Sequence, residues 1–523
     1  MRPFKLLLLL LLVSLPVGCS REPAPQEAVE DESTGDALSH DMMVLGRQLE
    51  DPYSLKNVTK ALANLYPSKA EDLRPTDMYV RFLPADEDQF ALLESLGVNM
   101  LDHPLDYQIL REGDYYHDPK VPEGAITWQY AVLPHDFELP QGIVYEILDD
   151  CYIPENAATK ASDVDWDEVE REAFRLSGNA DMLLPVTKAK TNPSGRITIE
   201  DPLFNGGQPF GVAGVRVVCN VFVKFASTFT TRDGYYTIPK TFSSSPRYRL
   251  MFQNQKGFEI GFNLLLVPAS LSTLGKGPAA GIDAHISEAS DRKLFCRSVV
   301  NNAAWEYYER CAEDDLKIAT PPPLVRIWIF QKIADSSSPM LRHGTLLDMT
   351  LLNKFLGDYT PLLALFLPDI TIGAENKYTY SSLYAETVHE LSHASHFSQV
   401  GKEYWDKYIL YVLDSFINDG GGAYGTGTGD DAGYCGIGES WAYFMQNTLM
   451  NDRYGGTMPT SGSSYWFHPQ IFRYLYERSF TRSQLFAALG EEVHSEEALK
   501  DRLLKLYPDK SGVIQQVFAR YVD

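Results

Sequence analysis

The stretch SSLYAETVHELSHASHFSQVG, residues 381–401, decides how the second half of the chain is expected to fold. It predicts one helix that begins at serines able to cap the first turn and ends at Gly401. The apolar positions indicate that this helix packs in a core; they are Val388, Leu391, Ala394 and Phe397. His389 and His393 are four residues apart, so both lie on one helix face, one turn apart.

Two histidines at this spacing are suited to hold a metal ion. Zinc prefers imidazole and carboxylate ligands in a tetrahedral shell, and catalytic sites leave one position open for water. Glu390, beside the first histidine, is placed to take a proton from water whose pKa the metal has lowered. The pattern His389-Glu390-Leu391-Ser392-His393 therefore predicts a hydrolytic zinc centre.

This H-E-x-x-H motif resembles that of the zincin metallopeptidases, which implies a Zn²⁺ cofactor and a protein or peptide substrate. The metzincin class needs a later third histidine, and His396 comes too early for it. The gluzincin class takes a glutamate from a later helix. By that resemblance the third ligand is Glu439 in GYCGIGESWAYFMQNTLM, residues 433–450, where Ala442 leaves room for close helix packing.

Other residues compete for places around the site. Asp430 and Asp431 are rival third ligands, because their loop partly resembles that of the aspzincins. His396 is interpreted as a hydrogen-bonded or exposed histidine that does not bind the metal. Tyr443 stands where the thermolysin-like pattern has an aspartate that orients a histidine ligand, so Glu386 or Asp414 is expected to supply that carboxylate.

Transition-state stabilisation in zincins often uses a downstream tyrosine or histidine, and Tyr465 and His468 are available for that role. The glycine-rich segment 418–438 lacks the lysine of a phosphate-binding loop and fits a mobile lid or a flexible insertion. The strand DITIG, residues 369–373, precedes the metal helix and is expected to bind substrate backbone at its edge.

The N-terminus reads as a secretory signal over residues 1–18, with Arg2 and Lys5 before an apolar run. Gly18-Cys19 resembles a bacterial lipoprotein signal, in which Cys19 is lipidated; a simple cleaved signal is the alternative. Residues 19–40 predict an acidic, disordered tether, similar to surface lipoproteins of Bacteroidetes-type bacteria. A lipid-anchored protein of the cell envelope, at the outer membrane or cell surface, follows from this resemblance.

The remaining chain predicts a multidomain α+β protein. Residues 41–190 form a small N-terminal α+β domain, with helical periodicity over 41–66, as in YSLKNVTKALANLY, then a strand at 78–83, a helix in 86–97 and a second strand at 98–104. Residues 275–523 form a mostly helical, zincin-like catalytic domain with a buried strand at 324–330.

Residues 196–270 change to short alternating strands broken by Gly, Asp-Gly and Ser-Pro, which is typical of an antiparallel sandwich. The turn Thr231-Arg232-Asp233-Gly234-Tyr235-Tyr236 resembles that of the carboxypeptidase regulatory-like, transthyretin-type β-sandwich domain. Such domains usually support a neighbour.

The net charge and the cysteine content limit the classes of function that the chain can have. The net charge of −24 over 523 residues disfavours binding to nucleic acid, because such a surface repels phosphate backbones. The cysteines after Cys19 are few and odd in number, so they do not form a disulfide scaffold. Cys296 and Cys311 lie about 22 Å apart in one expected helix and cannot pair.

The leading hypothesis is therefore a lipid-anchored, extracytoplasmic zinc endopeptidase with Glu390 as general base. A surface binding or adhesion lipoprotein with a structural or degenerate zinc site is the alternative. A zinc-free helix with coincidental histidines is the third interpretation.

Overall fold

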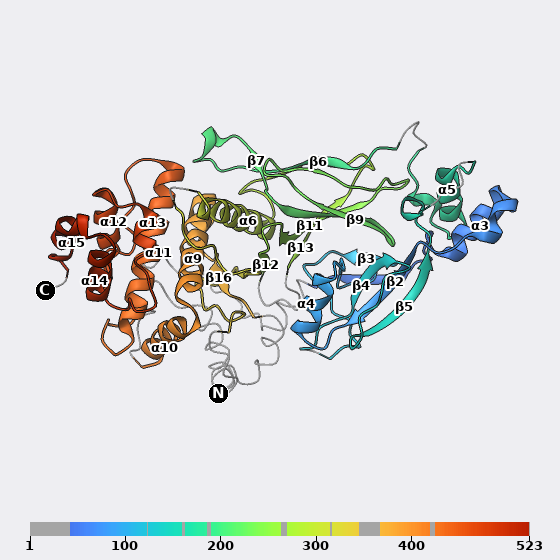
Figure 1. Cartoon of the computed structure of the whole chain (residues 1–523). Coiled ribbons are helices and arrows are strands. Elements are labelled where there is room, and N and C mark those ends of the chain that lie inside the picture. Colours follow the sequence, from blue (N-terminus) through green and yellow to red (C-terminus); the bar gives the residue numbers. More distant parts are fainter. Residues whose placement is uncertain are drawn as a thin grey trace, which may run out of the picture.

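The fold was analysed in a computed structural model (Figure 1). The structure describes residues 42–521, apart from 123, 159–162, 186–189, 263–268, 314–315, 345–366 and 419–423. It confirms a mixed α and β architecture with several sheets. The predicted signal peptide 1–18, Cys19 and the tether 19–40 lie outside the described residues. None of the described helices has the length and apolar character needed to cross a bilayer.

The N-terminal part combines a three-stranded antiparallel sheet of order β4-β2-β5 with a separate β1–β3 pair. Its elements are β1 (Val44–Gln48), α3 (Leu55–Leu65), β2 (Asp77–Leu83), α4 (Glu87–Ser95), β3 (Tyr107–Arg111), β4 (Gln129–Pro134), β5 (Val144–Cys151) and α5 (Trp166–Leu176). The helix in 86–97 and the strand at 78–83 are confirmed. The helix expected over 41–66 is confirmed only from Leu55 onward, because Val44–Gln48 form strand β1, paired with β3. Asp86 caps α4 by accepting the Gln89 backbone N–H.

The strand expected at 98–104 is wrong. Leu101 makes only an isolated bridge to Tyr130, and the residues after it turn. Just after this stretch, the backbone N–H of Leu105 donates to the Tyr79 hydroxyl at 2.8 Å.

Two sheets form the middle of the molecule, and the expected strands of 196–270 are among them (Figure 1). The smaller sheet has the order β10-β6-β14 with β7 beside β6, and the larger has the order β16-β15-β12-β11-β8-β9 with β13 beside β11. The strands are β6 (Ser194–Ile199), β7 (Phe210–Gly211), β8 (Val215–Val221), β9 (Lys224–Phe229), β10 (Tyr235–Thr237), β11 (Arg247–Asn254), β12 (Glu259–Phe262), β13 (Leu271–Lys276), β14 (Ala284–Ile286), β15 (Arg326–Phe330) and β16 (Ile370–Gly373). Both sheets contribute to one hydrophobic core, through Ile197 and Val217 for example.

The larger sheet runs through the boundary that the sequence places at 270–275. β12 pairs in parallel with β15, and β15 pairs in parallel with β16. Every residue of β15 and β16 is buried, as a strand covered on both faces requires. The domain limits stay predictions, but β8, β9, β11 and β12 of the expected sandwich belong to the same sheet as β15 and β16, the strands before the motif helix.

The C-terminal part is mostly helical, as expected. Its helices are α9 (Tyr380–Val400), α10 (Lys402–Asn418), α11 (Ala432–Tyr454), α12 (Pro469–Glu477), α13 (Arg482–Phe486), α14 (Glu496–Leu506) and α15 (Ser511–Phe518). α9 lies between α11 and the earlier helix α6 (Arg292–Cys311). Cys296 and Cys311 are both in α6, and the five cysteines after Cys19 are all buried free thiols.

A buried ion cluster joins α5 to the sandwich strands. Glu170 of α5 accepts from Lys224 at 3.2 Å, from Lys190 at 2.8 Å and from the Tyr53 hydroxyl at 2.5 Å. Lys224 is fully buried. Burial by itself would raise the pKa of Glu170, but the Lys224 and Lys190 charges outweigh it and lower that pKa to about 2.

Replacing Glu170 by Gln is expected to lower the free energy of unfolding by about 1–3 kcal/mol, because the buried Lys224 would lose one of its two carboxylate partners and keep only Glu155, 2.8 Å away. Urea denaturation measures this, and Glu168→Gln, exposed on the same helix, is the matched control. Since folding lowers the Glu170 pKa from 4.5 to about 2, its stabilisation is complete above pH 4.5 and falls as the pH drops toward 2. An E170Q protein as stable as E168Q would contradict this account.

Candidate metal centre

The metal helix α9 is buried along the whole motif. Thr379 caps it by accepting the Ser382 backbone N–H, so the cap is a threonine one position before the helix and not the expected serines. The helix ends at Gly401, whose φ of 81° requires the left-handed conformation that glycine adopts readily. The predicted core positions are confirmed, with Leu391 and Ala394 fully buried.

The second helix of the site, α11, begins earlier than the sequence suggested. It starts at Ala432, so Glu439 lies in its third turn and the final part of the glycine-rich segment is helical. A Cβ at Gly433 would lie 1.8 Å from the His494 carbonyl oxygen, and one at Gly436 would lie 2.8 Å from the Trp466 ring. These glycines let α11 pack closely on its neighbours. The predicted lid includes 419–423, which lie outside the described residues.

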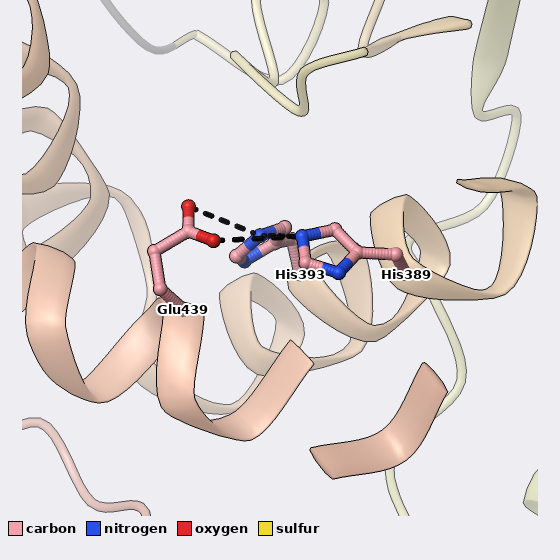
Figure 2. Close-up of side chains that lie close together, drawn as sticks. All are labelled: His389, His393 and Glu439. Atoms are coloured by element: carbon pink, nitrogen blue, oxygen red, sulfur yellow. Dashed lines mark hydrogen bonds and ion pairs between the residues drawn. The ribbon is translucent and has the colours of Figure 1, made fainter. Parts of the chain in front are cut away.

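The two helices bring together the three predicted ligands His389, His393 and Glu439 (Figure 2). The two histidine Nε2 atoms are 3.2 Å apart. Glu439 places Oε2 at 3.5 Å from Nε2 of His389 and Oε1 at 3.4 Å from Nε2 of His393. Among the residues that the structure describes, this is the group with side-chain atoms close enough to share a metal ion.

The spacing of these atoms fits a tetrahedral metal ion. Ligand atoms about 2.0–2.1 Å from zinc at tetrahedral angles lie about 3.3–3.4 Å from one another. The two histidine Nε2 atoms, 3.2 Å apart, agree with that value. A different Glu439 oxygen faces each of them, Oε2 at 3.5 Å from His389 and Oε1 at 3.4 Å from His393. The Oε2 atom of Glu439 is buried without a hydrogen bond, which also suits an atom that would bind a cation. The residues therefore fit an ion with two nitrogen ligands and one oxygen ligand.

Burial and mutual charge shape the electrostatics of this cluster. Burial alone would raise the pKa of Glu439, but the adjacent imidazoles hold it well below its usual range. Burial opposes protonation of His389, yet its contact with Glu439 and the nearby carboxylates raises its pKa to about 9. Burial lowers the pKa of His393. A metal ion needs both imidazoles neutral beside the ionised carboxylate, so its binding would displace the proton that His389 otherwise holds.

Gln446 and Tyr408 hold the ligands in place, and the sequence analysis missed both. The Nδ1 atom of His389 donates to Gln446 Oε1 at 3.1 Å. The Tyr408 hydroxyl donates to Glu439 Oε1 at 2.5 Å, and its ring stacks on His393. Gln446 is seven residues after Glu439, two turns along the same helix face, so helical periodicity could have indicated it. Tyr408 had no such signal.

The carboxylates expected to orient a histidine do not do so among the described side chains. Glu386 accepts from the Ser336 hydroxyl at 2.8 Å and lies 3.7 Å from Lys377. The Asp414 side chain lies outside the described part. For His389, an amide therefore takes the role predicted for a carboxylate.

Glu390 is buried beside the cluster and is held by Ser338, another residue that the sequence did not indicate. The Ser338 hydroxyl donates to Glu390 Oε2 at 2.8 Å, and the Trp405 indole donates to the Ser338 carbonyl at 2.9 Å. Burial raises the pKa of Glu390 to about 8, against the opposing effects of His389 and Ser338.

The rival and auxiliary residues lie outside the three-ligand cluster. Asp431 sits at the N-cap of α11, beside the exposed Asp430. His396 is fully buried against Tyr404 and Trp405, so the expectation of an exposed or hydrogen-bonded histidine is wrong within the described chain. Burial lowers its pKa to about 3.

The two residues predicted as transition-state stabilisers lie in different surroundings. Tyr465 packs among Tyr424, Tyr443 and Phe467, and of these the Tyr443 ring contacts His389. His468 pairs with Glu496 at 2.7 Å and packs against Tyr521. The structure thus connects Tyr465 to the site through the Tyr443 ring and engages His468 with the C-terminal helices.

Comparison with known proteins gave no match to any family model or to any curated protein.

Replacing Glu439 by Ala is expected to abolish tight binding of one zinc ion per chain, because it removes the oxygen ligand shared with both histidines. Metal content after dialysis, measured by plasma mass spectrometry, tests this. Asp431→Asn is the matched control, since it removes a carboxylate at the start of the same helix. Zinc retained in E439A and lost in D431N would reverse the assignment of the ligand.

Proposed function

We propose that this chain is a zinc-dependent endopeptidase of the gluzincin type, anchored by lipid at Cys19 in the cell envelope. The observation that carries the proposal is the convergence of His389, His393 and Glu439, whose possible ligand atoms all lie within 4.8 Å of one another. The glutamate next to the first ligand supports hydrolysis over simple metal storage. Protein or peptide substrates follow from the zincin resemblance, and the charge of −24 argues against a nucleic-acid partner.

The ligand set suits catalysis because it counts three protein groups in the described chain. Structural zinc sites are closed by four protein ligands, whereas catalytic sites keep a position for water or substrate. A bound zinc ion would polarise the scissile carbonyl and make water acidic enough to react near neutral pH. Tyr408 and Gln446 would keep the ligand atoms oriented during that chemistry.

Glu390 would act as general base toward the attacking water and then return the proton to the leaving amine. Ser338 fixes the carboxylate through Oε2, which leaves Oε1 to accept the proton from water. The backbone carbonyl of Glu390 also accepts from Ser338, at 2.9 Å, so one serine ties the segment before β16 to the catalytic turn.

The edge of β16, where substrate backbone was expected to bind, is already partly occupied by the chain itself. At Thr371 of β16 the strand edge is already paired with Ser337, with N–O distances of 2.8 and 3.0 Å in an antiparallel bridge. An extended peptide would therefore add to the outer side of residues 336–338 and not directly to β16. This places the substrate backbone next to Ser338, the residue that holds Glu390.

One observation favours the alternative of a binding lipoprotein with a structural zinc site. The three ligands are only 2–7% exposed, which is deep for groups that must meet a polypeptide. That alternative predicts that the chain binds zinc tightly but cleaves no peptide. The third interpretation, a helix with coincidental histidines, predicts neither zinc binding nor cleavage.

Glu390→Gln is expected to retain zinc and to reduce peptide-bond cleavage about 10²–10⁴-fold, since the amide cannot take a proton from water. Cleavage of a peptide library followed by mass spectrometry, alongside metal content, provides both measurements. Glu403→Gln, an exposed glutamate on α10, is the control and should match the wild type. A fully active E390Q protein would contradict the proposed role of Glu390 as general base. A wild-type protein that holds zinc but cleaves no peptide would favour the binding lipoprotein with a structural zinc site.

Ser338→Ala is expected to lower kcat about tenfold with little change in KM, because Glu390 loses the hydrogen bond that orients its carboxylate. The neighbouring Ser337→Ala is the matched control: its hydroxyl bonds Thr371 and not Glu390. Steady-state kinetics on one cleaved peptide compares the two. Equal losses in both variants would indicate a general disturbance of the segment and would refute the positioning role.

A further inference from the structure

A second cavity lies away from the metal centre, where the N-terminal strands meet the large sheet. Its volume is about 340 Å³, at the lower end of the range for small-ligand sites. Residues near β1 and β3 line one side, residues 178–182 after α5 line another, and β8, β11 and β13 supply the rest.

The cavity is lined by an excess of positive charge. Its lining cations are Arg47, Arg247, Arg249 and Lys276, while Asp181 is its one acidic lining residue. The chain as a whole carries a net charge of −24. Four cations around one small cavity are therefore a local reversal of the protein's charge, as expected where a negative ligand binds.

The neighbouring carboxylates compensate only part of this charge. Glu112 pairs with Arg247 and lies 3.8 Å from Arg249 Nε. Asp102 bonds the buried His103 at 2.8 Å and also accepts the Tyr116 backbone N–H. Within the described residues, neither Arg47 nor Lys276 forms an ion pair.

Arg249 forms the buried part of the cationic lining. Its side chain is 1% exposed, its Nη1 donates to Asn220 Oδ1 at 3.1 Å, and its Nε has no hydrogen bond. Burial and the Arg247 charge lower the pKa of Arg249 to about 9, so it is still protonated at neutral pH. A buried guanidinium without a well-placed carboxylate is unfavourable unless an anion completes its surroundings.

We propose that this cavity binds a tetrahedral oxyanion, a phosphate or sulfate group, either as the free ion or carried by a larger molecule. Guanidinium groups match such oxygens with paired N–H donors, and Lys276 adds a point charge. The cations approach from three strands, β1, β11 and β13, which suits a group with acceptors in several directions better than a planar carboxylate. The site shares no residue with the metal centre.

Isothermal titration calorimetry of the full chain at constant ionic strength tests the proposal, with inorganic phosphate, inorganic sulfate, glucose 6-phosphate and acetate as probes. The Glu439→Ala background keeps phosphate from binding a metal at the other site. We expect saturable binding of one phosphate or sulfate per chain and much weaker acetate. Tighter binding of glucose 6-phosphate than of phosphate would identify a carried group, and equal binding would identify the free ion.

Lys276→Met and Arg47→Met, both at exposed positions, are each expected to weaken phosphate binding about tenfold without changing the melting temperature of the ligand-free protein. Lys505→Met, exposed on α14, removes the same charge elsewhere and should leave the affinity unchanged. No saturable binding of any of the three oxyanion probes, acetate binding as tight as phosphate, or an equal loss in K505M would each overturn the proposal.

Discussion

An ionised carboxylate in the interior sets the strictest requirement on the helical part of this protein. Glu439 is 2% exposed, and an isolated buried charge would be very unfavourable. Two imidazoles from α9 and one hydroxyl from α10 surround it. Three helices must therefore keep their relative positions for the charge to be tolerated. One oxygen still has no hydrogen bond, and a cation placed between the three ligands would complete the arrangement.

The position of α9 depends on contacts far from the motif. Tyr307 of α6 donates to Ser395 at 2.9 Å on the face away from the ligands, and Arg292 at the start of α6 donates to the Ala374 carbonyl just after β16. α6 also packs on β11 and β12. Because β12 pairs with β15 and β15 with β16, the sandwich strands and the metal helix are mechanically one unit. This explains why the composition change near residue 270 marks no break in the sheet.

The features that could be predicted from the sequence are those that depend on interactions between residues close together in the chain. The α9 helix and its i, i+4 histidines depend on periodicity and on Gly401, so they were predictable. Glu439 came from resemblance, and the structure places it beside both histidines. Ser338 and Tyr408 could not be found, because their roles arise only when distant segments meet. The expected strand at 98–104 is wrong because only Leu101 finds a backbone partner there, in an isolated bridge to Tyr130 that the local sequence does not indicate.

The candidate metal centre and the second cavity both combine burial with incompletely compensated charge, and the two charges have opposite sign. At the candidate metal centre the buried Glu439 is negative, and its Oε2 atom has no hydrogen-bond donor. At the second cavity the buried Arg249 is positive, and its Nε atom has no hydrogen-bond acceptor. Each is assembled from segments far apart in sequence, so a bound ligand would stabilise the folded chain over the unfolded one. Since the sites share no residue and their ligands differ in charge, the two stabilising effects should be separable and close to additive.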